Sequence, residues 1–273
     1  MCLQKLRDKT LEIKNLVLDV FEQGHTGHIA SSYSCAEILV ALFYGNILRF
    51  DPQNPKWPDR DRFILSKGHA GIIYYSILSD LGFFPKEELM RFGSAGSICG
   101  VHVDGRVPGV EANAGSLAGG FGVAVGMAHA AKLDLKNHLV FALLGDGECY
   151  EGAIWEGAMH AAFYKLNNLI AIVDHNHMCC TGFIENRMGI EPLDKKWEAF
   201  GFDVECIDGH NFDEILNVLS RIRCRKSSKP LCIIADTVKA HGLISVENTP
   251  LCHGWAPKSA EAFSKARAEL NGR

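Results

Sequence analysis

The sequence predicts a doubly wound α/β fold, with a mostly parallel sheet and helices on both of its faces. Three strongly apolar runs, at 139–144, 169–173 and 231–235, have the length of strands and show no alternation with polar residues. Strands of this composition are buried on both faces, as in parallel sheets. The order strand, helix, strand then implies right-handed crossovers. Helical patterns separate or follow the three runs, at 151–165, 195–200 and 213–223.

The first half of the chain is predicted to be mainly helical, with one short strand. Apolar spacing predicts a helix at 3–21 that ends at Gln23-Gly24, and a helix at 35–44 with Ser34 as its N-cap. Eight glycines between residues 94 and 122 predict a long loop, and loops of that length in a domain are usually functional. The remaining elements expected here are a proline-rich loop at 51–62, a strand at 63–66 and helices at 72–81 and 86–92.

The end of the chain is predicted to be an irregular segment at 241–258 followed by a helix at 259–270. The sequence has no internal repeat, low-complexity tract or linker, so a single domain over residues 1–273 is expected.

Composition is that of an ordinary globular protein and excludes several classes of partner. Hydrophobic residues make up 47% of the chain and charged residues 22%, with a net charge of −4. This charge gives no general attraction to nucleic acid or anionic lipid, and no apolar run is long enough to cross a membrane. A charged start without a signal-peptide pattern predicts a cytoplasmic protein. Most of the ten cysteines are expected to be reduced core residues, with a redox role as the alternative for the pair Cys179-Cys180.

The strongest local signal lies at the ends of two predicted strands. Gly145-Asp146-Gly147 follows the first buried run, and Asn176 follows the next after 28 intervening residues. In doubly wound folds, ligands bind at the carboxyl ends of the strands. Carboxylate and amide oxygens are hard ligands that suit Mg²⁺, which usually bridges to phosphates. The sequence therefore predicts a magnesium–phosphate site at this edge of the sheet.

This pair of motifs resembles the thiamine diphosphate signature, in which GDG is followed after a similar interval by an asparagine. The resemblance implies a fold of the thiamine diphosphate-binding type, specifically the module that holds the cofactor's diphosphate (the PP module). It also implies Mg²⁺, or Ca²⁺ or Mn²⁺ in its place, bound by Asp146, Asn176 and the main chain of Met178.

Further motifs resemble those of transketolases over almost the whole chain. Gly24-His25-Thr26-Gly27 is similar to the family's GHPG loop, and Ser66-Lys67-Gly68-His69 to its S-x-G-H. Residues 51–63 match the DPxNP…DRDRF run, and residues 115–120 resemble GPLGQG or GSLGQG, with Ala118 at a usual glycine. Residues 239–257 are similar to the KGKG…HG-AP ending.

The resemblance assigns site residues. It implies catalytic roles for His25 and His253 beside the reacting carbon and for His102 at the terminal hydroxyl of the donor sugar. Imidazoles suit such proton transfers because they donate or accept near neutral pH. It leaves His28 and His177 without a role. The cofactor-binding residues that it implies are His69, Gly115, Ser116, Leu117, Gly147, Glu151, Asn176 and His253.

The chain resembles only the N-terminal part of a transketolase. The family's activating glutamate and its sugar-phosphate-binding residues lie in a further domain, so the resemblance implies a split enzyme that is inert alone. The expected partner is a C-terminal subunit, in a two-plus-two assembly. The implied reaction transfers a two-carbon ketol unit from a ketose to an aldose.

Three other functions remain as alternatives. One is another thiamine diphosphate enzyme, similar to 1-deoxyxylulose-5-phosphate synthase or to an acyloin-forming ligase. A second is a catalytically inert regulatory subunit. A nicotinamide-binding Rossmann protein is disfavoured because residues 115–120 lack GxGxxG and follow no buried strand.

Overall fold

The computed structural model describes residues 2–180 and 182–272, and its central feature is a parallel five-stranded sheet with the order β1-β2-β3-β7-β6. Neighbouring strands pair in parallel throughout this sheet. The strands are β1 (Arg62–Leu65), β2 (Val140–Gly145), β3 (Leu169–His175), β6 (Asp203–Asp208) and β7 (Leu231–Asp236). A separate antiparallel pair is formed by β4 (Met178–Cys179) and β5 (Gly182–Phe183).

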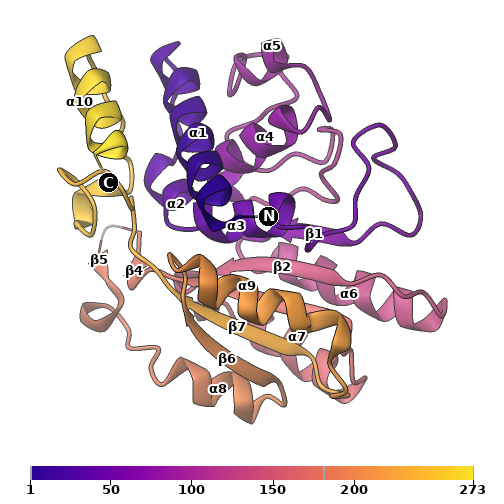
Figure 1. Ribbon diagram of the computed structural model, residues 1–273. Coiled ribbons are helices and arrows are strands. Elements are labelled where there is room, and N and C mark those ends of the chain that lie inside the picture. The colour runs from indigo at the N-terminus through magenta and orange to yellow at the C-terminus, as the bar shows by residue number, and fades with distance from the viewer. Residues whose placement is uncertain (1, 181, 273) are drawn as a thin grey trace.

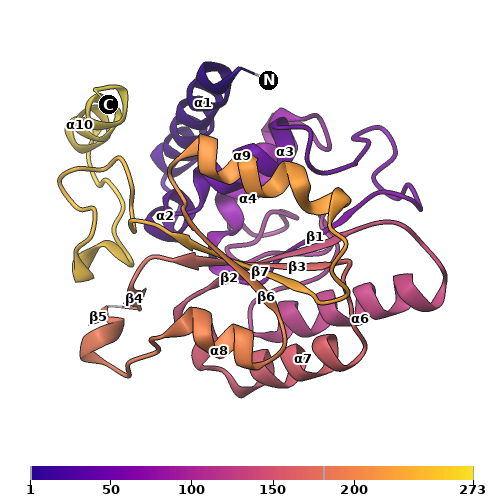
Figure 2. The same ribbon diagram turned by 60° about the horizontal axis from the view of Figure 1, so that its bottom comes forward.

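Helices cover both faces of the sheet, as Figures 1 and 2 show. One layer contains α6 (Gly119–Leu133), α7 (Gly152–Phe163) and α8 (Leu193–Ala199). The opposite layer contains α1 (Leu3–Glu22), α2 (Ile29–Tyr33), α3 (Ala36–Tyr44), α4 (Gly71–Asp80), α5 (Lys86–Leu89) and α9 (Phe212–Arg221), with α10 (Ala260–Asn271) packed beside α1. The predicted doubly wound fold is confirmed.

Alternation within each strand divides the core into two halves. Phe141 and Leu143 of β2 pack with the layer of α1, α3 and α4, whereas Ala142 and Leu144 pack with the layer of α6 and α7. The same alternation holds along β3 and β7. Because every second side chain points to the opposite face, both faces of these strands must be apolar. This explains the continuous apolar runs of the sequence.

Several elements differ from the sequence prediction. The predicted loop at 94–122 ends earlier, because α6 begins at Gly119. A Cβ at Gly120 would lie 2.8 Å from the Cα of Ser66, so this glycine permits close packing inside a helix. The predicted N-cap, Ser34, does not cap a helix: α3 is preceded by Cys35 without a side-chain cap, and the Ser34 hydroxyl donates to Asp174 instead. The elements α2, α6, β4, β5 and β6 were not predicted.

The structure bears on the pairing of the cysteines and on the presence of membrane-spanning helices. All ten cysteines are unbridged, and Cys180 is exposed while Cys179 is half-buried. Among the described residues, no helix has both the length and the hydrophobicity required to cross a membrane.

Candidate active site

A pocket opens at the carboxyl ends of β2 and β3, where the two strand-end motifs meet. Gly145 at the end of β2 pairs with Asp174 of β3, which brings Asp146 and Asn176 to the same edge. Nine residues assigned from the sequence line this pocket: His69, His102, Gly115, Leu117, Asp146, Gly147, Asn176, Met178 and His253. Its lining also includes residues to which the sequence assigned no role: His28, Ser31, Lys67, Glu148, Lys239 and both cysteines of the pair 179–180.

Asp146 is a buried carboxylate held by two backbone N–H groups. The amide of Gly147 donates to Oδ1 at 2.7 Å and the amide of His177 donates to Oδ2 at 2.6 Å. Burial and the nearby Asp174 carboxylate nevertheless raise the pKa of Asp146 to about 7. Each carboxylate oxygen retains a lone pair, so a bound cation would compensate the buried negative charge.

Asn176 is oriented by its neighbours in the same turn. Its side-chain Nδ2 donates to Asp174 Oδ2 at 3.2 Å, and its Oδ1 accepts from the amide of Met178 at 3.2 Å. Carboxylate and amide oxygens of this kind are the donor set that Mg²⁺ prefers. The pocket therefore has an oxygen-rich end that fits a hard divalent cation.

Four histidines of the pocket lie close to one another. The ring of His28 lies 5.5 Å from that of His69, 5.8 Å from that of His102 and 5.2 Å from that of His253, between ring centroids. Burial lowers the pKa of His28 to about 4, with further contributions from His253, His102 and Lys239. Its Nδ1 is buried and makes no hydrogen bond within the described part of the chain. An orphaned ring nitrogen of this kind is available to a ligand.

His25 lies elsewhere. Its Nε2 contacts the carbonyl oxygen of Met90 at 2.7 Å, and it lines a different groove with residues 254–260. Between the two histidines, Gly27 packs closely, since a Cβ there would lie 3.1 Å from the ring of Phe21, and His28 directly precedes α2. The structure places the second of the two Gly-His pairs, and not the first, beside His69, His102 and His253, and a role for His25 stays a prediction.

Ser116 and Glu151 also stay outside the pocket. Both are exposed, and Glu151 precedes α7 on the surface. A different glutamate, Glu148, reaches the pocket, where its carboxylate accepts hydrogen bonds from the Ser66 hydroxyl and from the amides of Ala118 and Gly145. Glu148 therefore ties together three of the segments that line the pocket. Its position directly after Gly-Asp-Gly was the only sequence signal for it.

Ala118 has a left-handed backbone conformation, with φ of 66°. That region is unfavourable for residues with a Cβ and is the usual place for glycine. Ala118 stands at a usual glycine of the sequence motif, and this conformation gives the physical reason for that preference.

Two lysines make the middle of the pocket basic. Lys67 is 1% exposed, and its ammonium donates to Asp174 and to the carbonyl of Ser31 at 2.9 Å. Burial alone would lower the pKa of Lys67, but the Asp174 carboxylate raises it above its usual value. Lys239 Nζ lies 3.4 Å from His253 Nδ1, and burial lowers the pKa of this lysine.

Replacing Lys67 with methionine is expected to lower the free energy of unfolding by about 3–5 kcal/mol. The variant would leave the Asp174 carboxylate, which is 0% exposed, without its cation. Urea denaturation checks this value. Lys136→Met is the control because Lys136 forms an exposed pair with Asp59 at 3.3 Å, and such pairs contribute about 1 kcal/mol or less. Equal effects of both substitutions would contradict a structural role for the buried pair.

The family model for the thiamine diphosphate binding domain of transketolase matches residues 7–271. The chain belongs to the transketolase family. It is similar to a 6-deoxy-6-sulfo-D-fructose transketolase subunit of Clostridium sp. strain MSTE9, with 39% identity over 94% of this chain and 93% of that protein. It is also similar to an apulose-4-phosphate transketolase subunit of Phocaeicola vulgatus, with 36% identity over 97% of this chain and 95% of that protein.

Longer transketolases match over only part of their length. Human transketolase is 34% identical over 92% of this chain but only 40% of its own length. The crystal structure of the Campylobacter jejuni enzyme superposes with a TM-score of 0.92 and 34% identity, covering 99% of this chain and 43% of that one. The chain therefore spans about the length of the transketolase subunits and less than half of these full-length transketolases.

Proposed function

We propose that the chain is the diphosphate-binding subunit of a two-chain transketolase that transfers a two-carbon ketol unit between sugars. The single observation that carries this proposal is that one pocket is lined both by the oxygen-bearing side chains of Asp146 and Asn176 and by His69 and Lys239. A metal-bound diphosphate needs both kinds of groups next to each other. The family match supplies the type of chemistry.

The residues of the pocket fit thiamine diphosphate and Mg²⁺. Asp146, Asn176 and the main chain of Met178 would hold the metal, and His69 and Lys239 would contact the diphosphate. Gly147 lets the turn pack closely against Cys179, because a Cβ at this position would lie only 3.2 Å from the Cys179 side chain. When bound, the cofactor supplies the nucleophilic thiazolium carbon.

The histidines would then move protons on the sugar. Lowered pKa values keep His28 and His253 neutral near pH 7, and a neutral imidazole can accept a proton from a hydroxyl. Lys239 Nζ lies 3.4 Å from His253 Nδ1, and a hydrogen bond donated by the lysine leaves the ring proton on Nε2. His253 would then donate a hydrogen bond to the sugar, and His28 would act as the proton acceptor. His28 takes the role that the sequence had assigned to His25, and His102 stays a candidate for contact with the donor's terminal hydroxyl.

The partner surface is proposed to lie on α6 and α7. Their outward faces combine small residues that leave the backbone open, at Gly119, Gly122 and Gly126, with exposed large side chains at Met159 and Phe163. Met159 is 55% exposed and Phe163 is 78% exposed. An apolar face of this kind is typical of a protein interface. Its proposed occupant is the C-terminal subunit, which would bring the activating glutamate and the sugar-phosphate-binding residues.

Substituting Met159 with glutamate is expected to weaken binding of the C-terminal subunit by at least tenfold, because a charge would enter an apolar contact. Light scattering coupled to gel filtration of the mixed subunits measures this association. Asn217→Glu on α9 is the matched control, since this exposed position lies in the opposite helical layer. If the Asn217 variant associates as poorly as the Met159 variant, or if both associate normally, the proposed surface is wrong.

The names of related subunits indicate which donor sugars to test. The two related transketolase subunits are named for 6-deoxy-6-sulfo-D-fructose and apulose 4-phosphate. Both are ketoses with an anionic group at the far end. We propose a ketose of this general type as the donor.

A further inference from the structure

Two clusters of titratable side chains lie outside the pocket's lining. One contains Glu37, His210 and His241, and the other contains His175, His177 and Asp236. In each cluster, the atoms that could bind a metal lie within 4.8 Å of one another. The ammonium group of a lysine lies within the first cluster, and this distinguishes it from the second.

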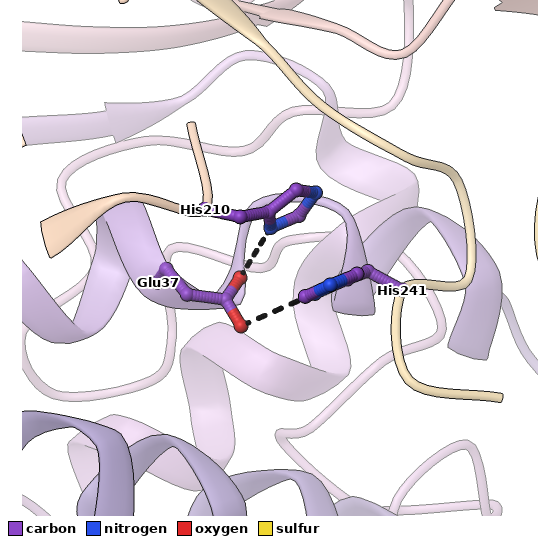
Figure 3. A group of neighbouring side chains, drawn as sticks. All are labelled: Glu37, His210 and His241. Carbon is purple, nitrogen blue, oxygen red and sulfur yellow. Dashed lines mark hydrogen bonds and ion pairs between the residues drawn. The ribbon is translucent and has the colours of Figure 1, made fainter. Parts of the chain in front are cut away.

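The first cluster is complete without a metal. Figure 3 shows both imidazoles directed at the Glu37 carboxylate, with His210 Nδ1 3.0 Å from one oxygen and His241 Nδ1 3.5 Å from the other. The Lys14 ammonium lies 2.8 Å from Glu37 Oε1 and 3.5 Å from His241 Nδ1. The amide of Val238 donates to His210 Nε2 at 2.9 Å. The lysine thus supplies the positive charge, and this cluster is a structural network.

The second cluster pairs imidazoles with carboxylates. His177 Nε2 lies 2.6 Å from Asp236 Oδ1, and His175 Nε2 lies 2.9 Å from Glu191 Oε1. Among the described residues, the ion-pair partners found for these carboxylates are the two imidazoles themselves. The two histidine rings lie with their centroids 4.1 Å apart and their planes tilted by 44°.

His175 shows an unmet requirement for a partner. The residue is 8% exposed, and its Nε2 is buried without a hydrogen bond of acceptable geometry to any described residue. Glu191 is near enough for an ion pair, but its orientation does not satisfy this nitrogen. A metal ion would satisfy it, since a neutral ring nitrogen is a common metal ligand.

We propose that His175, His177 and Asp236, with Glu191 as the fourth ligand, bind a divalent transition-metal ion of the zinc type. Two imidazole nitrogens and two carboxylate oxygens form a donor set that suits zinc and its neighbours better than Mg²⁺. Zinc–ligand distances of about 2.0–2.2 Å place tetrahedral ligand atoms about 3.4 Å apart. The two close pairs, at 2.6 and 2.9 Å, therefore need to open by less than about 1 Å. The ligand atoms of His175, His177 and Asp236, which lie within 4.8 Å of one another, need to move to the same spacing.

The sheet holds two of these ligands in place. His175 of β3 and Asp236 of β7 are register partners across the parallel pair, so their side chains leave the same face of the sheet. The amide of Thr237 donates to the His175 carbonyl at 3.0 Å, which fixes the strand ends. Ligands on rigid elements bind with less loss of conformational entropy. The other two, His177 and Glu191, are exposed and give the ion a path from solvent.

The proposed ion site adjoins the pocket without sharing its ligands. Asn176 lies between the two histidines in the chain, and the amide of His177 donates to Asp146. A bound ion would fix His177 and with it the turn that holds Asp146. The site therefore predicts two metals of different chemistry at one edge of the sheet.

Titration of the full chain with Co²⁺ alone, in the absence of thiamine diphosphate, tests this site. Visible absorption and calorimetry are expected to show one tightly bound ion with nitrogen and oxygen ligands, and a tenfold excess of Mg²⁺ should not displace it. His177→Ala and Asp236→Asn should each weaken binding at least tenfold. Both positions are exposed, so these variants are expected to fold.

His129→Ala is the matched control, because His129 forms a separate exposed histidine pair with His160 at 3.0 Å. It should leave Co²⁺ binding unchanged. Binding that is lost in the His129 variant, equal in the wild type and the His177 variant, or absent from the wild type would overturn the proposal. Thiamine diphosphate binding by the His177 variant is measured separately, and its retention shows that the loss of Co²⁺ binding is not a loss of the fold.

Discussion

Replacing Asp146 with alanine is expected to lower kcat/KM of the assembled enzyme by at least about 1,000-fold. The substitution removes the carboxylate that would hold Mg²⁺, and a metal's stabilisation of charge amounts to several kcal/mol. Thiamine diphosphate should then bind with the same low affinity whether or not Mg²⁺ is present. Calorimetry with and without the metal measures this difference directly. The account predicts a large metal effect in the wild type and none in the variant.

Asp213→Ala serves as the control for Asp146→Ala. Asp213 is exposed in the first turn of α9, on the opposite face of the sheet from α6 and α7. The Asp213→Ala variant should bind cofactor and metal like the wild type. Metal-dependent cofactor binding by the Asp146 variant would contradict the assignment of this carboxylate as a ligand.

Because the pKa of Asp146 is raised, the binding of Mg²⁺ at this carboxylate should depend on pH. Below about pH 7 the folded chain keeps the proton that Mg²⁺ must displace. The apparent Mg²⁺ affinity should therefore rise with pH, by up to about tenfold per unit, and level off above about pH 7.

Stability of the metal-free chain should change in the opposite direction. The folded-state pKa of Asp146 is raised above its unfolded value of 3.8, so the folded chain binds more protons between these values. Asp146 alone therefore lowers stability as the pH rises from about 4 to about 7, by up to about 4 kcal/mol. Added Mg²⁺ should restore stability above pH 7. Urea denaturation with and without Mg²⁺, for the wild type and Asp146→Ala, isolates this contribution.

Removing the His28 imidazole is expected to reduce kcat/KM by about 100- to 10,000-fold in the assembled enzyme. His28→Ala removes the ring that lies among His69, His102 and His253. His25→Ala should change the rate far less, by about threefold or less, because His25 lies in a different groove. Steady-state kinetics of both variants beside the wild type makes this comparison.

A loss of activity in His28→Ala could also come from a packing defect. His28→Asn, which keeps a polar side chain of similar length, controls for this. The thermal unfolding of the His28→Asn variant should be close to that of the wild type. If His25→Ala causes the larger loss while His28→Ala stays active, the assignment to His28 is wrong. A pH–rate profile that loses an ionisation only in the His28 variants would locate the proton transfer at this ring.

Sequence patterns were most informative where burial is complete. The runs that became β2, β3 and β7 are apolar on both faces, and the structure places them as the buried strands. The edge strand β6 escaped prediction because three of its six residues are charged, so it lacks the continuous apolar run of the central strands, and only Ile207 of it is buried. Helix α6 escaped prediction because it contains several glycines, which usually indicate a loop; one of them, Gly120, instead allows close packing against Ser66.

The site was predictable at its strand ends and less so elsewhere. Asp146 and Asn176 follow strands, and parallel strands bring their carboxyl ends together. His25 and His28 each directly follow a glycine, and the pattern alone could not decide which one faces the pocket. In the folded chain His28 lines the pocket and His25 lines a different groove, and this depends on tertiary packing that the sequence pattern does not show. Glu148 was missed for a similar reason, since its hydrogen bonds join segments that are distant in the chain.

The most direct test of the central claim is a ketol-transfer assay with the chain, its C-terminal subunit, thiamine diphosphate and Mg²⁺. Xylulose 5-phosphate, 6-deoxy-6-sulfo-D-fructose and apulose 4-phosphate are offered in turn as donors, with an aldose phosphate as acceptor. The account predicts transfer from at least one donor only when both chains and both cofactors are present, and loss of transfer in Asp146→Ala. Failure of thiamine diphosphate to bind even with the partner present, or transfer by either chain alone, would contradict it.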